Sequence, residues 1–264
     1  MRSFALAILP LLLALASCTS TDYDLVETAS ISPKFHDTDP QNFGKITPHH
    51  HPVHGIDVSK WNGEINWLMV KDSGVSFAFM KATEGKDRLD SRFHENWRGA
   101  RAARIPYAPY HFYYFCSTAD DQADWFIRNV PKSATYLPPV LDVEWNGSSK
   151  NCKYRPSKAT AVFELKKFMD RLEKHYGKRP LIYTTVDFHR DILVGEFNEY
   201  HFWLRAVAQH PSKVYERDRW AFWQYTATGR IPGIKGDTDI NVFAGTRKNW
   251  QNWVKTAASD WEGG

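Results

Sequence analysis

Short apolar runs alternate with segments of helical periodicity between residue 54 and residue 185 of the chain. Each run has the length of a buried strand, and the segments between the runs have room for helices. An alternation of this kind favours a parallel sheet whose helices lie outside it. The apolar runs predict strands at Gly55–Ser59, Val75–Lys81, Tyr107–Phe115, Pro139–Trp145 and Pro180–Thr185.

Several of the intervening segments have helix signals of their own. Phe93–Arg104 is amphipathic, and Thr118 is a good N-cap because two aspartates follow it in the first turn. The clearest helix runs from about Ser157 to Tyr176, where apolar residues recur at helical spacing, and Gly177 supplies its end. These signals support the assignment of strand–helix units.

After residue 185 strands remain predictable, but no convincing helices separate them. A last helix is predicted at about Thr246–Lys255. The total of eight strands predicts an α/β fold, an irregular TIM-like barrel of five βα units followed by three strands. An open doubly wound sheet is the competing architecture, and it is disfavoured because no glycine-rich phosphate loop follows the first strand. The three later strands are predicted at His201–Ala206, Trp220–Thr226 and Asp237–Phe243.

The first residues have the features of an export signal. Arg2 precedes an apolar run, Phe4–Ala16, that is too short to span a bilayer as an ordinary helix. The run ends in Leu15-Ala16-Ser17-Cys18, which resembles the bacterial lipoprotein signal, where cleavage before the cysteine precedes its acylation. We predict a signal peptide at residues 1–17 and a lipid anchor on Cys18. A plain secretory signal with an incidental cysteine is the alternative.

A polar segment follows the signal. Residues 18–50 are rich in Thr, Ser, Asp, Pro and His and predict a flexible tether, followed by a globular domain at residues 51–256 and a tail at 257–264. A histidine cluster at the end of the tether could bind metal in principle, but its Pro-containing polar setting favours a solvated segment, and we expect no metal and no cofactor. The cluster consists of His49, His50, His51 and His54.

Composition narrows the class of partner. Hydrophobic residues make up 42% and charged residues 24% of the chain, as in a soluble globular protein. A net charge of +4 is too small to indicate nucleic-acid binding, although it is compatible with an acidic polymer as substrate. The 11 Trp, 12 Tyr and 16 Phe residues suit either a core or sugar-stacking platforms.

The strongest candidate for chemistry is a pair of acidic residues on the fourth predicted strand. Asp142 and Glu144 lie two residues apart, so that their side chains share one face of the strand about 6.6 Å apart. Carboxylates that point into a barrel are costly to bury without a purpose. Cleavage of a glycosidic bond needs such a pair, one to protonate the leaving oxygen and one to stabilise positive charge at the sugar. A structural salt-bridge cluster is the alternative.

Two further acidic residues lie at the ends of the first and last predicted strands. Asp57 lies between Ile56 and Val58, which point outward, and Asp239 has the same setting in the last strand. The first and eighth strands are neighbours in a closed barrel. The fold is therefore expected to gather four acidic residues at one mouth of the barrel.

Two cysteines remain beyond Cys18. Cys116 follows the third predicted strand and Cys152 follows the fourth, and neither belongs to a CxxC pair. An even pair in an exported protein predicts a disulfide, because that compartment is oxidising. Adjacent strands are about 4.8 Å apart, so that their exit loops can approach bonding distance.

Six segments, taken in order, resemble glycoside hydrolase family 25, the lysozymes with an irregular barrel. The resemblance implies that Glu144 is the general acid, that Asp142 is its partner, and that Asp57 and Asp239 are further acidic residues of the site. The segments are Gly55-Ile56-Asp57-Val58-Ser59, Lys81-Ala82-Thr83-Glu84-Gly85, Tyr110-His111-Phe112, Leu141-Asp142-Val143-Glu144, Trp223-Gln224-Tyr225 and Asp239-Ile240-Asn241.

Other residues resemble positions near the family's sugar-binding groove, namely Tyr110, Tyr183, Trp203 and Gln224. Lys81 and Glu84 belong to this groove or form a buried ion pair. The chain departs from the family's Trp-Ile-Ala-x-Tyr pattern, because Arg205 stands where many members have alanine. An arginine there pairs with a site carboxylate or contacts an acidic muropeptide.

The resemblance implies an N-acetylmuramidase that cuts the β-1,4 bond between N-acetylmuramic acid and N-acetylglucosamine in peptidoglycan strands. We expect a monomer in the cell envelope, held on a membrane by its anchor. Two other hypotheses remain, a non-catalytic peptidoglycan-binding lipoprotein and a hydrolase of another 2-acetamido sugar polymer. The first is disfavoured because a decayed enzyme would normally lose the acid or its partner.

Overall fold

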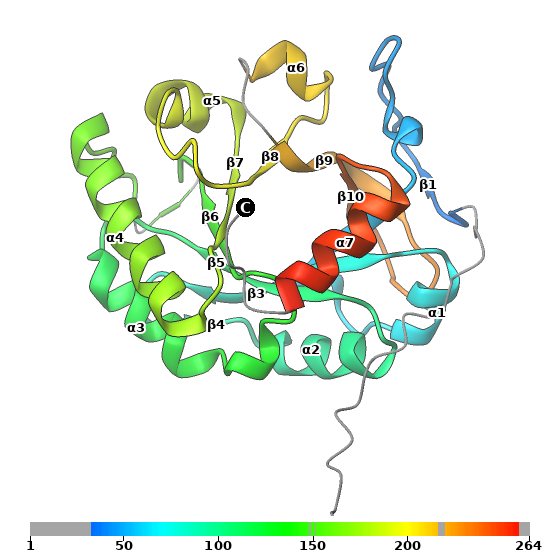
Figure 1. Cartoon of the computed structure of the whole chain (residues 1–264), viewed down its shortest axis with the longest axis horizontal. Coiled ribbons are helices and arrows are strands. Elements are labelled where there is room, and N and C mark those ends of the chain that lie inside the picture. Colours follow the sequence, from blue (N-terminus) through cyan, green and yellow to red (C-terminus); the bar gives the residue numbers. More distant parts are fainter. Residues whose placement is uncertain (1–32, 148, 151, 216–219, 259–264) are drawn as a thin grey trace, which may run out of the picture. The chain divides into compact units, whose positions relative to one another are not determined.

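Eight strands close into a barrel in the computed structural model (Figure 1), which describes residues 33–147, 149–150, 152–215 and 220–258. These residues belong to one compact unit, Ser32–Gly264. The barrel closes because β9 pairs with β8 and β10, and β10 in turn pairs with β2, which confirms the closed architecture. Its strands are β2 (His54–Val58), β3 (Phe77–Glu84), β5 (Tyr107–Phe112), β6 (Val140–Val143), β7 (Leu181–Thr184), β8 (Phe202–Arg205), β9 (Trp220–Arg230) and β10 (Thr238–Phe243).

The last barrel strand runs against its neighbours. β2, β3, β5, β6, β7, β8 and β9 are parallel, whereas β10 is antiparallel to both β9 and β2. The parallel arrangement of the strand–helix units does not extend to this strand, because the short connection from β9 to β10 has no room for a crossover helix. The reversal places Asp239 near the start of β10, directly opposite Asp57 in the register.

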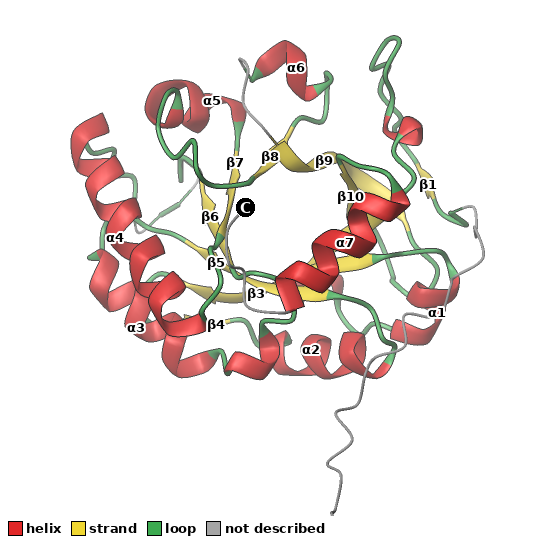
Figure 2. Ribbon diagram, in the orientation of Figure 1, coloured by secondary structure: helices red, strands yellow, loops and turns green. Residues whose placement is uncertain are grey.

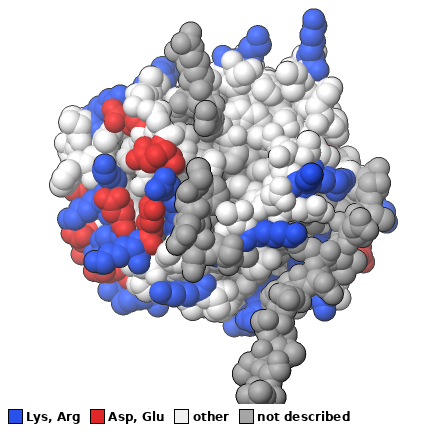
Figure 3. Space-filling model, in the orientation of Figure 1, with Lys and Arg blue, Asp and Glu red and all other residues white. Residues whose placement is uncertain are grey.

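Helices cover the outside of the first half of the barrel, as Figure 2 shows. They are α1 (Trp67–Asp72), α2 (Phe93–Ala102), α3 (Ala119–Asn129) and α4 (Lys158–Tyr176). The N-cap predicted at Thr118 and the helix end predicted at Gly177 are confirmed, because the Thr118 hydroxyl accepts from Asp121 N–H and Gly177 adopts a left-handed φ of 68°. The Ser157 hydroxyl caps α4 by accepting from Thr160 N–H. Across their outer faces Lys167 and Arg171 of α4 pair with Asp120 and Asp124 of α3, and charges of both signs gather there in Figure 3.

The second half of the barrel has only short helical pieces, as the fading periodicity predicts. They are α5 (Val186–Phe188), a π-helical turn at His189–Leu193, and α6 (Pro211–Val214). Single 3-10 turns lie at Pro48–His50, Lys60–Asn62 and Lys132–Ala134, and β4 (Arg88–Leu89) extends β3 outside the barrel.

Side chains alternate between the barrel interior and the layer under the helices. Trp203 and Phe79 point inward, whereas the neighbouring Leu204 and Met80 pack outward. Helix α7 (Arg247–Ala258) lies across one end of the barrel (Figure 1), where Trp250 packs 5.3 Å from the ring of Phe77. Since β3 begins at Phe77, α7 closes the end where the parallel strands start, and the opposite mouth is left for the acidic residues.

The segment before the first barrel strand has a defined place on the barrel. β1 (His36–Asp37) pairs antiparallel with β9, Phe43 packs edge-on 5.0 Å from Trp223, and Pro48 is buried. This part of the predicted tether therefore differs from a solvated spacer, because its few apolar residues find partners on β9. The predicted signal peptide and Cys18 lie outside the described residues, as does the tail from residue 259. No helix in the described part of the chain is long and apolar enough to cross a membrane.

Candidate active site

Asp57 lies at the centre of a hydrogen-bond network at the open mouth of the barrel. Its Oδ2 accepts from Gln224 Nε2 at 2.9 Å and from Asn241 Nδ2 at 2.8 Å. Burial raises the pKa of Asp57 to about 6, and these two bonds and the charge of Arg205 oppose that rise. The carboxyl group is therefore held in a fixed orientation by strands β9 and β10.

A second layer of side chains fixes the two amides. Tyr183 donates its hydroxyl to Gln224 Oε1 at 2.9 Å, and Trp203 Nε1 donates to Asn241 Oδ1 at 2.7 Å. With their oxygens occupied, both amides present their NH₂ groups to Asp57. Trp203 is 2% and Gln224 3% exposed, so that they lie beneath the mouth and act on a bound molecule through Asp57.

Asn241 is the member of this network that the sequence analysis left out of the site. The signal was present in the sequence, because the period of two along β10 places Asn241 on the same face as Asp239. Tyr110 is buried near the same carboxylates, and burial raises its pKa well above the usual value, so that it keeps its proton.

Asp239 faces Asp57 across the β2–β10 pair, and its side chain is half-buried. Burial raises its pKa to about 8, with a further contribution from the charge of Asp57. The predicted neighbourhood of the first and last strands is confirmed by this register.

Asp142 and Glu144 come from the end of β6. Asp142 is 7% exposed and lies beside Tyr183 in the register, and its Oδ1 is buried without a hydrogen-bond partner among the described residues. Glu144 follows directly after the strand and is half-buried. An unpartnered buried oxygen is costly, so a bound molecule with a suitable donor would relieve it.

Burial raises the pKa of both carboxyl groups. For Asp142 the pKa rises well above its usual value, and the charge of Glu144 adds to the effect of burial. For Glu144 burial also raises the pKa, while the charge of Arg205 opposes it. Asp142 is the more deeply buried member of the pair, and Glu144 is the more exposed one.

Two cations face the carboxylates. Lys81 Nζ lies 2.7 Å from Glu84 Oε2, and both side chains are 17% exposed, so the alternative of an ion pair is the one observed. Tyr114 also donates to Glu84, at 2.8 Å. Arg205 is the last residue of β8, in register with Gln224.

A disulfide between Cys116 and Cys152 confirms the predicted bridge, with the two Cα atoms 5.8 Å apart. It joins the loops that follow β5 and β6. The bridge therefore ties the chain just after Glu144 to the neighbouring strand.

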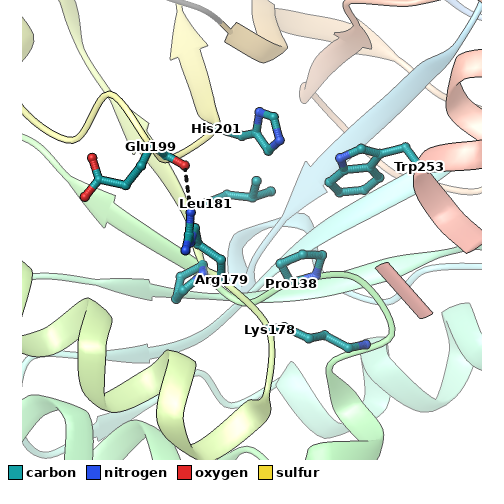
Figure 4. A pocket seen from close by; sticks show the side chains of 8 residues that line it. Pro138, Lys178, Arg179, Leu181, Glu199, His201 and Trp253 are labelled. Atoms are coloured by element: carbon teal, nitrogen blue, oxygen red, sulfur yellow. Dashed lines mark hydrogen bonds between the residues drawn. The ribbon is translucent and has the colours of Figure 1, made fainter. Parts of the chain in front are cut away.

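A small pocket lies at the opposite end of the barrel (Figure 4). Its volume is about 30 Å³, room for a single water molecule, so it does not compete with the acidic mouth as a substrate site. Its lining comes from the starts of β7 and β8 and from α7, and includes Leu181, His201 and Trp253. In the described part of the chain, no three His, Cys, Asp or Glu side chains are grouped to hold a metal ion.

The acidic mouth has the parts for acid-assisted cleavage of a sugar bond. A carboxyl group with a raised pKa can donate a proton, and a second carboxylate can stabilise positive charge. Such a site at the carboxyl ends of parallel barrel strands is the usual place for catalysis in this architecture.

Comparison with known proteins agrees with this class. The sequence model of glycosyl hydrolases family 25 matches residues 56–234, and the chain belongs to that family and is a glycoside hydrolase. It is 37% identical to Lysozyme M1 of Streptomyces globisporus over 203 residues, 74% of this chain and 68% of that protein. It is 36% identical over 223 residues to protein YegX of Escherichia coli K12, covering 81% of this chain and 78% of YegX.

A solved structure shares the fold. A family 25 glycosyl hydrolase from Bacillus anthracis superposes with a TM-score of 0.70 and 32% identity, covering 83% of this chain and 99% of that one. The irregular barrel is thus the fold of this family.

Proposed function

We propose that the protein is an N-acetylmuramidase that hydrolyses the β-1,4 bond between N-acetylmuramic acid and N-acetylglucosamine in peptidoglycan. The observation that carries the proposal is the Asp142–Glu144 pair, one buried and one half-buried carboxyl group at the mouth of the barrel, both with pKa values raised by burial. Its likeness to a protein named Lysozyme M1 supports peptidoglycan as the substrate.

Glu144 is the general acid in this proposal. It lies beyond the end of β6 and is more exposed than Asp142, so that it can reach a glycosidic oxygen in the mouth. Burial raises its pKa, which favours the protonated form that a general acid needs. The proton passes from Glu144 to the leaving oxygen as the sugar bond breaks.

Asp142 stabilises the positive charge that develops at the sugar. Its buried, unpartnered Oδ1 is an acceptor for the N–H of a 2-acetamido group. Held in this way, the acetamido oxygen of the substrate attacks the anomeric carbon, and Asp142 is ionised while it orients the amide. With Asp142 ionised in this way, Glu144 carries the proton of the pair when the substrate is bound.

The other site residues hold this arrangement. Asp57 is fixed by Gln224 and Asn241, and Asp239 lies beside it. Tyr110, Tyr183 and Trp203 are buried beneath the mouth and support the carboxylates that meet the sugar chain. We also propose that a lipid on Cys18 keeps the monomeric enzyme in the cell envelope.

Mass spectrometry of the fragments released from purified peptidoglycan tests the function. Reducing-end muramic acid supports the muramidase. Reducing-end glucosamine identifies a glucosaminidase instead, and chitin oligosaccharides cut in preference to peptidoglycan identify a hydrolase of another 2-acetamido polymer. Peptidoglycan that is bound without release of fragments identifies a binding lipoprotein.

A further inference from the structure

Arg205 points into the mouth of the barrel. Along β8 the side chain of Trp203 lies in the interior and that of Leu204 lies under the helices, so the period of two directs Arg205 inward. Its Cα is in register with that of Gln224, which donates a hydrogen bond to the Asp57 carboxylate. The arginine is therefore one step above Trp203, at the level of the catalytic carboxylates.

The backbone of Arg205 is firmly held. Its carbonyl accepts the hydroxyl of buried Tyr215 at 2.6 Å, and the same hydroxyl lies 3.2 Å from the carbonyl of Thr184 at the end of β7. This contact fixes the end of β8 against β7. The guanidinium consequently starts from a defined position.

The two cations of the site, Lys81 and Arg205, differ in whether they form an ion pair. Lys81 forms an ion pair with Oε2 of Glu84. The other oxygen of Glu84, Oε1, accepts hydrogen bonds from Tyr114 and Arg88. The guanidinium of Arg205, by contrast, makes no ion pair or hydrogen bond with any residue that the structure describes, although its charge opposes the rise in the pKa values of Asp57, Glu144 and Asp239. The guanidinium therefore interacts electrostatically with three carboxyl groups and is hydrogen-bonded to none of them.

A half-buried guanidinium needs acceptors for its donors. Its planar fork matches a carboxylate in two parallel hydrogen bonds.

We propose that Arg205 binds a carboxylate of the substrate and makes the site selective for glycans with acidic muramic acid residues. The inference rests on the proposed function and adds a specificity residue to it. Two carboxylates have this chemistry, the lactyl carboxylate of muramic acid without a peptide and a carboxylate of the peptide stem.

The test measures binding of three ligands to the Glu144→Gln protein, which prevents turnover during titration. The ligands are a peptide-free glycan oligosaccharide, the same oligosaccharide with its lactyl carboxylates converted to methyl amides, and a muropeptide oligosaccharide with intact stems. Isothermal titration gives each dissociation constant for proteins with Arg205, Arg205→Gln and Arg205→Lys. Arg128→Gln, on the outer helix α3, is the control for loss of one positive charge.

With Arg205 present, a charged ligand is expected to bind about 10–100-fold more tightly than the neutral amide. In Arg205→Gln that ratio falls to about one, and Arg205→Lys restores part of it, because lysine keeps the charge without the fork. Arg128→Gln keeps the full ratio. A preference for the peptide-free glycan over its amide assigns the lactyl carboxylate, and a preference for the muropeptide alone assigns the stem.

The inference is overturned if Arg205→Gln and Arg205→Lys retain the full ratio, or if the parent shows no preference for either charged ligand. Equal weakening of all three ligands would mean that Arg205 only organises the site. Thermal melts show whether each variant folds. If Arg205→Gln does not fold, the binding ratio of Arg205→Lys decides the outcome. Failure of the proposed function is separate, because it is measured by fragments released by the unaltered protein.

Discussion

Asn241 shows how much one amide contributes to the carboxylate network. It donates to Asp57 and accepts from Trp203, and it is fully buried. Asn241→Ala leaves an indole N–H unpaired and removes one donor from Asp57. We expect a loss of about 1–3 kcal/mol in the free energy of unfolding.

Urea denaturation measures that loss. Asn198→Ala is the control, because Asn198 is exposed and its amide donates to the nearby carbonyl of Gly195. Equal stabilities of the two variants would show that the network contributes nothing.

Asp239 predicts a stability that depends on pH. Its pKa in the folded protein is about 8, above the unfolded value of 3.8, so the folded state favours the protonated form. The stability from this group is complete below about pH 4 and is lost as the pH rises through about 8. Asp239→Asn imitates the protonated form and should stabilise the protein most above pH 8, by roughly 1–3 kcal/mol, since solvent screens a partly exposed group.

The difference between variant and parent isolates Asp239 from the other titrating groups. Thermal unfolding of both proteins at pH 5 and at pH 9 provides the measurement. A gain that is equal at the two pH values, or larger at pH 5, contradicts the assigned burial of this carboxyl group.

The sequence predicted that four carboxyl groups gather at one mouth of the barrel, but not how deeply each of them is buried. Asp142 and Glu144 follow from their spacing on one strand, and Asp57 and Asp239 from their place at strand ends. Burial raises the pKa of both members of the Asp142–Glu144 pair, and Asp142 is the more deeply buried of the two. Burial of this kind is set by loops such as the one after β6, which carries no periodic pattern.

At the scale of elements, the strands were predictable because each combines an apolar run with turn residues at its ends. Helix α1 (Trp67–Asp72) was not predicted, since it is too short for a periodic pattern. The reversed direction of β10 was also missed, because local hydrophobicity is the same for parallel and antiparallel strands. The length of the β9–β10 connection was the available signal.

The disulfide is an element-scale prediction. It closes a loop with a sequence separation of 36, and removing it should cost about 3–4 kcal/mol by the entropy of the unfolded chain. Replacing both Cys116 and Cys152 by serine should lower the urea midpoint accordingly. Mass mapping that finds both thiols free in exported protein, or an unchanged midpoint, would contradict the bridge.

At the scale of the whole molecule, the closed barrel followed from the count of strands and their regular spacing. The docking of residues 33–50 did not, because their polar composition is that of a tether and their contacts depend on β9. The packing of such a segment can be predicted only when the surface against which it packs is known.

The proposed lipid anchor belongs to the same scale. Cys18→Ser should abolish acylation, so the protein should fractionate as soluble or as uncleaved precursor, since each buried CH₂ of an acyl chain contributes about 0.8 kcal/mol to membrane binding. Mass spectrometry of the mature N-terminus and membrane fractionation check this. If the unaltered protein carries no lipid, the proposed anchor is wrong and residues 1–17 are a plain secretory signal.

The central claim is that Glu144 delivers the proton that breaks the glycan strand, and turnover of Glu144→Gln on peptidoglycan tests it most directly. Glutamine keeps the shape of the side chain but cannot donate this proton, so kcat should fall about 10²–10⁴-fold while the affinity for glycan changes little. Glu199→Gln, an exposed position at the opposite end of the barrel, should keep its activity. If Glu144→Gln retains near-normal turnover, Glu144 is not the acid and the account is wrong.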